Sequence, residues 1–178
     1  MSWREGRRPA TLAPLLALGA AVALAGCGIR PLYAPTAAGT TASAALAAVS
    51  IAPLDTRVGQ VLRNELIFGF TGGGPAATPA YGLRLVLTSQ ESELVIEQIE
   101  NIPEANLVAL TVTYTLTELA TGDVLLTGAT FANASFDYST QRFANIRAER
   151  DAEDRAARRL ASNILSRVAT YFATHPAP

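Results

Sequence analysis

The stretch LVALTVTYTLT, residues 107–117, alternates apolar and small polar side chains over most of its length. One side of the alternation holds Val108, Leu110, Val112, Tyr114 and Leu116, and the other holds Thr111, Thr113, Thr115 and Thr117. A period of two residues is typical of a β-strand, because successive side chains point to opposite faces of a sheet. The stretch therefore predicts a long strand with a buried apolar face and a second face rich in threonine.

Two further strands are predicted on either side of this stretch. Residues 81–98 alternate in the same way from Tyr81, with a bulge expected at residues 91–93. Residues 124–136 follow the loop ELATGD, in which Gly122 is expected to adopt a left-handed conformation. Three successive strands with short connections predict an antiparallel meander.

A first helix is predicted from the spacing of apolar residues in DTRVGQVLRNELIFGF, residues 55–70. Asp55 or Thr56 is expected to cap its first turn. The glycines and prolines of TGGGPAATP, residues 71–79, end it. Those glycines lack the Lys-Ser/Thr pair of a phosphate-binding loop, so we interpret them as a plain connection.

A second, longer helix is predicted for residues 139–174, where apolar residues recur every four positions. Ser139 or Thr140 is expected to cap it. The charge run RAERDAEDRAARR, residues 147–159, is either a binding site or a solvated helix face, and its balance of signs favours the solvated face. Opposite charges four residues apart are expected to form ion pairs worth about 0.2–0.5 kcal/mol each.

These elements, with a first strand at residues 46–54, give the order β-α-β-β-β-α. The predicted fold class is α+β, a two-layer sandwich with two helices packed on one face of a four-stranded mixed sheet. We expect a signal peptide at residues 1–26, a lipidated N-terminus and flexible tether at 27–45, one domain at 46–174, and a tail at 175–178.

The N-terminal segment carries the marks of a secretory signal. Arg4, Arg7 and Arg8 precede an uncharged run that is rich in Ala and Leu and ends at Gly26. The alternative is an uncleaved membrane anchor, for which about 18 uncharged residues are the lower limit of length. The sequence LAGC at the end of the run resembles the lipobox of bacterial lipoproteins. That resemblance implies cleavage after Gly26, a diacylglycerol on the Cys27 thiol and an N-acyl chain on its amine.

Other roles for Cys27 are less well supported. A disulfide within one chain is excluded, because there is no second cysteine. A buried small apolar residue is the structural alternative, and a catalytic thiol would need a base that only His175 could provide. In lipoproteins of enteric type an Asp after the cysteine favours retention in the inner membrane, so Gly28 is compatible with transport to the outer membrane. We expect an anchor there, facing the periplasm.

The composition excludes several classes of function. All 14 basic residues are arginine, and without residues 1–26 the chain has 11 Arg against 14 acidic residues, a formal charge of −3. That balance does not fit nucleic acid, and one His and one Cys exclude the usual metal sites. His175 lies in the predicted tail, and Glu91 and Glu93 are interpreted as edge charges. We expect no enzyme, no metal and no cofactor apart from the acyl chains on Cys27.

The threonine face has two interpretations. Neither residues 107–117 nor residues 124–136 contain a charged residue, although soluble proteins usually guard such surfaces with charge. The face is either an ordinary solvated one, protected by twist and by its neighbours, or it is covered by a partner. The candidate partner-facing residues are Thr111, Thr113, Thr115 and Thr117.

Three segments together resemble a known family: CGIRPLY (27–33), RVGQVLRNEL (57–66) and AERDAEDRAARRLASNI (148–164). They are similar to the lipopolysaccharide-assembly lipoprotein LptE of alphaproteobacterial type. The resemblance implies a non-enzymatic plug inside the outer-membrane β-barrel LptD. Such a plug assists barrel assembly and helps to deliver lipopolysaccharide to the outer leaflet. It also implies two helices on a four-stranded sheet.

Direct contact with lipopolysaccharide is a separate question. The family has been linked to this ligand through basic residues near loops between strands, but the loop at residues 99–106 has acidic residues and no arginine. Arg84 is the one strand arginine, and it is either a lipopolysaccharide contact or a snorkelling or salt-bridged side chain. Two other functions stay open: an accessory lipoprotein of a periplasmic ABC-type lipid transporter, and a lipid-anchored hydrolase.

Overall fold

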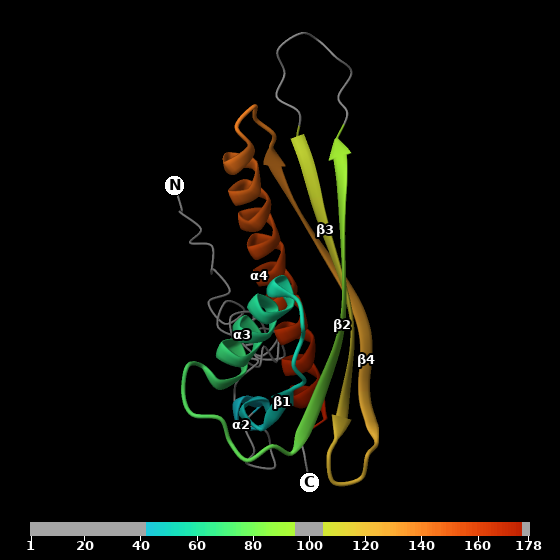
Figure 1. Ribbon diagram of the computed structural model, residues 1–178. Helices are drawn as coiled ribbons and strands as arrows, with labels where there is room; N and C mark the ends of the chain where they lie inside the picture. Colours follow the sequence, from blue (N-terminus) through green and yellow to red (C-terminus); the bar gives the residue numbers. More distant parts are fainter. Residues whose placement is uncertain (1–41, 95–104, 176–178) are drawn as a thin grey trace, which may run out of the picture. The chain divides into compact units, whose positions relative to one another are not determined.

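The computed structural model describes residues 42–94 and 105–175, which all lie within one compact unit, residues 32–178. Its elements are α2 (Ala42–Ala47), β1 (Val49–Ile51), α3 (Arg57–Thr71), β2 (Tyr81–Leu94), β3 (Ala105–Glu118), β4 (Val124–Asp137) and α4 (Arg142–Thr174). The helices lie together on one side of the long strands (Figure 1). The predicted α+β two-layer architecture is confirmed, with one additional short helix.

The sheet has the strand order β1-β2-β3-β4 and is mixed, because β1 is parallel to β2 and the other pairs are antiparallel. The register between β2 and β3 runs without a break to Leu94, so the bulge predicted at residues 91–93 is wrong. Glu91 keeps this register on the inner face by accepting a hydrogen bond of 3.1 Å from the Asn106 side chain. The irregularity lies instead at Leu116 and Thr117, opposite β4.

The core lies between the sheet and the helices. The alternation predicted for β3 is confirmed, since Val108, Leu110, Val112, Tyr114 and Leu116 are all buried. Leu62 and Leu66 of α3 and Leu160 and Ile164 of α4 are completely buried. Burying a side chain of this size contributes about 1.5–3 kcal/mol. The apolar side of residues 107–117 in β3 therefore determines which face of the sheet the helices cover.

The short helix α2 lies where the sequence predicts the end of the tether and the start of the first strand. Alanine has the highest helix propensity, and Leu46 anchors the helix against α3 and α4 with only 1% of its surface exposed. The first strand is consequently reduced to three residues in β1. Six residues are too few for a helical period to stand out in the sequence.

Helix α3 begins and ends as its sequence predicts. The Thr56 hydroxyl accepts a hydrogen bond of 3.1 Å from the Gly59 N–H, which confirms Thr56 as the N-cap. Gly72 ends the helix with φ of 62°. A Cβ atom on Gly59 would lie 2.7 Å from the Thr56 hydroxyl and 2.8 Å from the Leu54 Cβ atom. The glycine of the RVGQ sequence is therefore needed for the close approach of the chain before the helix.

Helix α4 keeps the predicted four-residue spacing but not the predicted cap. Its N-cap is Gln141, without a side-chain hydrogen bond, so the capping role predicted for Ser139 or Thr140 is wrong. The buried Asn145 side chain instead accepts from the Ser139 N–H at 2.8 Å and donates to the Ser139 carbonyl at 2.8 Å. Within residues 42–94 and 105–175, no helix has the length and hydropathy needed to cross a membrane.

Candidate functional site

The face of the sheet that points away from the helices is the candidate functional surface. Odd-numbered residues of β3 lie on it, since the even-numbered ones face the helices. Thr111, Thr113, Thr115 and Thr117 therefore share one face, as the alternation predicts. Thr111 and Thr113 are exposed, whereas Thr115 and Thr117 are half-buried. We call this surface the outer face.

The neighbouring strands add exposed apolar side chains to the outer face. Thr113 is paired with Val86 of β2 and with Ala129 of β4, and Thr111 is paired with Phe131 of β4. Val86 is 61% exposed and Phe131 is 70% exposed. Phe131 was not singled out from the sequence, although its odd position in β4 could have placed it opposite Thr111. The outer face is therefore uncharged around these paired residues, and it carries one highly exposed aromatic ring, that of Phe131.

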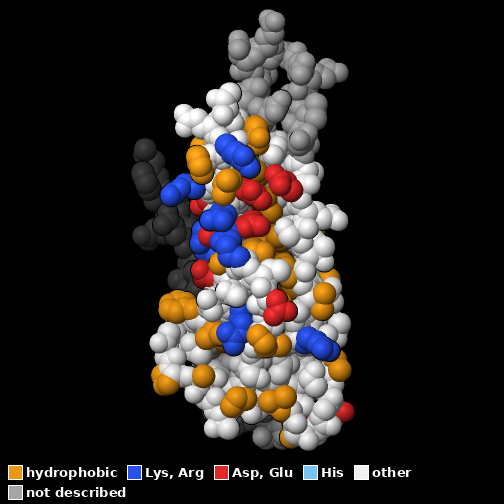
Figure 2. Space-filling view, viewed as in Figure 1, with side chains coloured by type: hydrophobic (Ala, Val, Ile, Leu, Met, Phe, Trp, Pro, Cys, Tyr) orange, Lys and Arg blue, Asp and Glu red, His pale blue; other side chains and the backbone are white. Residues whose placement is uncertain are grey.

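Arg84 lies at one end of the outer face, paired with Thr115. Its side chain is exposed and forms no ion pair or hydrogen bond with any residue that the structure describes. The interpretation of Arg84 as a salt-bridged residue is therefore not supported within residues 42–94 and 105–175. Figure 2 shows where charge gathers instead, over the upper half of α4.

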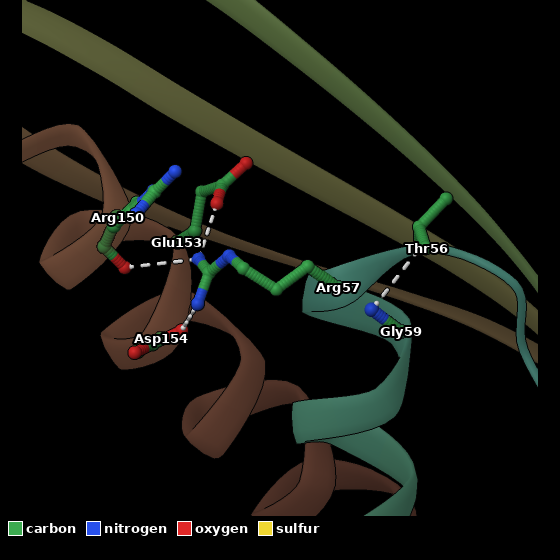
Figure 3. A network of polar contacts seen from close by, with 6 residues as sticks. All are labelled: Thr56, Arg57, Gly59, Arg150, Glu153 and Asp154. Carbon is green, nitrogen blue, oxygen red and sulfur yellow. Dashed lines mark hydrogen bonds and ion pairs between the residues drawn. The ribbon is translucent and has the colours of Figure 1, made fainter. Parts of the chain in front are cut away.

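The charge run of α4 is more than a solvated face, because two of its carboxylates hold α3. Arg57, the first residue of α3, directs its guanidinium to Glu153 and to Asp154, the latter at 2.8 Å (Figure 3). The same guanidinium donates to the Arg150 carbonyl at 3.3 Å. The hydrogen bond to Glu153 is the main cause that raises the pKa of Arg57. We call this arrangement the Arg57 clamp.

This clamp was not predicted from the sequence, because only charges within α4 were paired with one another there. Of the pairs expected four residues apart, the described part of α4 has one, between Arg155 and Asp151 at 2.8 Å. The signal that could have revealed the clamp was the Arg-x-Gly-Gln start of α3 together with the acidic pair in the later family segment. Two of the three segments that carry the family resemblance thus meet at one structural contact.

Glu149 lies one turn before the clamp on α4. Burial, followed by repulsion from Glu91 and Glu153, raises the pKa of its carboxyl group. The folded protein therefore binds a proton at Glu149 more readily than the unfolded chain does. Burial is the larger cause, and the nearby negative charge adds to it, partly balanced by Arg150 and Arg57.

The residues considered for chemistry lie apart. His175 stacks on Tyr171 at the end of α4, with ring centroids 4.6 Å apart, and Glu91 is engaged by Asn106. In the described ranges, no group of three or more His, Cys, Asp or Glu side chains could hold a metal ion. Gly26, Cys27 and the acidic residues 97, 100 and 104 lie outside the described residues.

The family LptE, described as lipopolysaccharide-assembly, matches residues 45–168. This match extends from α2 through most of α4 and includes the Arg57 clamp and the whole outer face. No curated protein sequence matches at a comparable level.

Solved structures of three bacterial lipoproteins share the fold. A protein of Caulobacter crescentus CB15 described as a lipoprotein has a TM-score of 0.61 and 21% identity, covering 74% of this chain and 96% of that one. A minor lipoprotein of Acinetobacter baumannii has a TM-score of 0.53 and 20% identity, with 68% and 87% covered. Rare lipoprotein B of Shewanella oneidensis has a TM-score of 0.52 and 14% identity, with 73% and 98% covered.

Proposed function

Because the chain belongs to the LptE lipopolysaccharide-assembly family, we propose that it is a lipoprotein subunit of the outer-membrane lipopolysaccharide translocon. In this proposal it is the plug and assembly partner of an LptD-like β-barrel, and it helps that barrel to insert lipopolysaccharide in the outer leaflet. Its role is structural and not catalytic. The observation that carries the proposal is the family match, together with a sheet face that is uncharged around Thr111 and Thr113 and that no described residue covers.

The size of the outer face suits a stable complex. Strands β2, β3 and β4 have 14 residues each, which corresponds to about 46 Å of length and about 14 Å of combined width. The resulting area of about 650 Å² is most of the roughly 800 Å² that each partner contributes to an interface of standard size. The sheet face alone could therefore provide most of the plug's contact with the barrel.

The chemistry of the outer face suits the inside of a barrel. The interior of an outer-membrane barrel is polar, and a charge buried there without a partner would be costly. Threonine hydroxyls at positions such as Thr111 and Thr113 can donate and accept hydrogen bonds without that cost. Phe131 and Val86 would bury their exposed rings and methyl groups in the same contact.

Membrane attachment is the second part of the proposal. A diacylglycerol and an N-acyl chain on Cys27 would hold the domain at the membrane, since each buried methylene contributes about 0.8 kcal/mol. We assign the anchor to the outer membrane and the domain to its periplasmic side. Arg84, a single cation without a described partner, is the residue that a lipopolysaccharide phosphate would meet on the outer face.

The proposal is tested by purifying the tagged protein from detergent-solubilised membranes and identifying the protein that accompanies it near one-to-one. We expect a large outer-membrane β-barrel, and we expect Thr111→Lys with Thr113→Lys to reduce its yield at least tenfold. The matched control is Gln60→Lys with Ser162→Lys, at exposed positions of α3 and α4. An ABC transporter component in place of a barrel would favour the accessory-lipoprotein function.

A further inference from the structure

Strand β4 is the last strand of the sheet, so the described chain pairs only one of its two edges. Arg155 of α4 donates to the Ser135 carbonyl at 2.9 Å, and this carbonyl therefore points away from β3. In an antiparallel pair, alternate residues direct both backbone groups to the same edge. The free backbone groups thus belong to Thr127, Ala129, Phe131 and Asn133, and we call this segment the β4 edge.

The other side of the sheet gives the same alternation independently. The Ala52 N–H donates to the Leu83 carbonyl at 3.0 Å, so the backbone groups of Leu83 point away from β3. Its partner Leu116 then forms its hydrogen bonds with Leu126 of β4. Thr127 is the next residue of β4 after Leu126, so its backbone N–H and C=O groups must face the free edge.

The two open edges of the sheet differ in their protection. Beyond Leu83, β2 has no partner in β1, but its sequence carries Arg84, Glu91 and Glu93. Charged residues of this kind are the usual guard against pairing with another strand. From Val124 to Phe136, β4 contains no charged residue. The β4 edge therefore lacks a protection that the same sheet has on its other side.

A groove of about 380 Å³ lies beside the lower half of the β4 edge. Leu126 and Thr127 line it from the strand. From α4 it is lined by Ser166, Arg167, Thr170, Tyr171 and Thr174. Inward side chains of a strand added along β4 would enter this groove, because they would lie on the face that α4 covers.

The floor of the groove is the side chain of Tyr114, which crosses over Gly128. A Cβ atom on Gly128 would lie 2.4 Å from the Tyr114 hydroxyl, so the ring extends across β4 towards its free edge. Within the described residues, nothing hydrogen-bonds this hydroxyl. The groove therefore combines the Tyr114 ring and its free hydroxyl with the side chain of Arg167, directly beside unpaired backbone groups.

We propose that β4 accepts an extended, uncharged segment of the barrel protein as an additional strand along the β4 edge. This inference rests on the proposed function. Unpaired N–H and C=O groups with a period of two are satisfied by another extended backbone. The added strand needs apolar side chains on its inward positions and small or polar ones beside Phe131. Strands of outer-membrane barrels have that alternation, and a barrel strand has a free edge until the barrel closes.

A second copy of this chain fits less well. Two β4 strands paired about a two-fold axis at Thr130 would place Ala132 and Ala134 of the second copy opposite Gly128 and Leu126. These alanines are already buried in their own core, at 3% and 8% exposure. They are also too small to fill the groove. In this register a strand of different sequence fills the groove better.

The experiment is photo-crosslinking in growing cells with the full chain. The photoreactive residue p-benzoylphenylalanine replaces Phe131, and the control replaces Phe143 of α4, which is 83% exposed. Each is combined with Ala129→Pro or with the control Ala129→Val. Proline removes only the edge-facing N–H of Ala129 and no hydrogen bond to β3. If Ala129→Pro fails to fold in a thermal scan, Ala129→Lys replaces it.

We expect a barrel adduct from Phe131 and none from Phe143, with the Phe131 adduct reduced at least tenfold by Ala129→Pro and unchanged by Ala129→Val. An adduct between two copies of this chain would overturn the inference. The inference would also be overturned if the barrel co-purified but formed no adduct, or if Ala129→Pro left the adduct unchanged. Either of these two results would leave the proposed function standing. Failure of the barrel to co-purify with the unmodified protein would overturn the proposed function and this inference together.

Discussion

Replacing Arg57 by alanine tests whether the Arg57 clamp fixes α3 on α4. The guanidinium, 43% exposed, pairs with carboxylates that are 21% and 30% exposed. Partly exposed ion pairs contribute about 0.2–1 kcal/mol each, and the hydrogen bond to the Arg150 carbonyl adds about 0.5–1.5 kcal/mol. Because the three contacts share one group and are not additive, we expect Arg57→Ala to lower the free energy of unfolding by about 1.5–2 kcal/mol.

Thermal and urea unfolding, followed by circular dichroism, measure this loss, which corresponds to a fall in Tm of about 5 °C for a domain of this size. The stability of Arg57→Lys should lie between that of Arg57→Ala and that of the unmodified protein. An ammonium group cannot reach both carboxylates and the carbonyl in the geometry of the guanidinium. The matched control is Arg158→Ala, an exposed arginine of α4, which should change stability by less than about 0.5 kcal/mol.

The electrostatic part of the effect should also respond to salt. At about 1 M NaCl the Debye length falls to about 3 Å, so the difference between Arg57→Ala and the unmodified protein should shrink. If Arg57→Ala and Arg158→Ala were equally stable at low salt, the reasoning would be refuted. The docking of α3 on α4 would then rest on apolar packing alone.

Three further predictions concern single positions. Gly59→Ala should destabilise the fold by about 1–2 kcal/mol in urea unfolding, because contacts with Thr56 and Leu54 outweigh a helix-propensity gain of at most about 1 kcal/mol. Glu149→Gln should stabilise the protein by up to about 0.5 kcal/mol at pH 7. The pKa of the Glu149 carboxyl is raised in the folded unmodified protein. The gain from Glu149→Gln should therefore disappear as the pH falls through this pKa to the ordinary value near 4. An unchanged gain at pH 3 would contradict the assignment. Intact-mass spectrometry should find a diacylglycerol and an acyl chain on a mature chain that begins at Cys27, and Cys27→Ser should abolish both.

Periodicity was sufficient to predict the layers of the fold. The alternation around Tyr114 identified the buried and outer faces of β3, and the four-residue spacing identified the buried side of α4. Gly122 has the predicted positive φ, at 80°. These features succeed because each depends on side chains that repeat along one element.

Features that depend on contacts between elements were not accessible in the same way. The Arg57 clamp joins residues about a hundred positions apart, and the space above Gly128 is filled by the Tyr114 ring from the neighbouring strand. Phe131 was placed in the correct strand, but its exposure depends on which face α4 leaves uncovered. Short-range polar contacts also led to a wrong prediction, since Asn145 and not a hydroxyl cap orders the chain before α4.

The most direct test of the account measures whether the outer face is covered in the cell. Thr113→Cys and the control Ser162→Cys, both at exposed positions, are labelled with a maleimide in intact membranes, before and after depletion of the barrel partner. The account predicts that Thr113→Cys is protected at least tenfold while the barrel is present and reacts freely after depletion, whereas Ser162→Cys reacts equally in both. Equal labelling of Thr113→Cys with and without the barrel would contradict the proposal that this sheet face is the plug's interface.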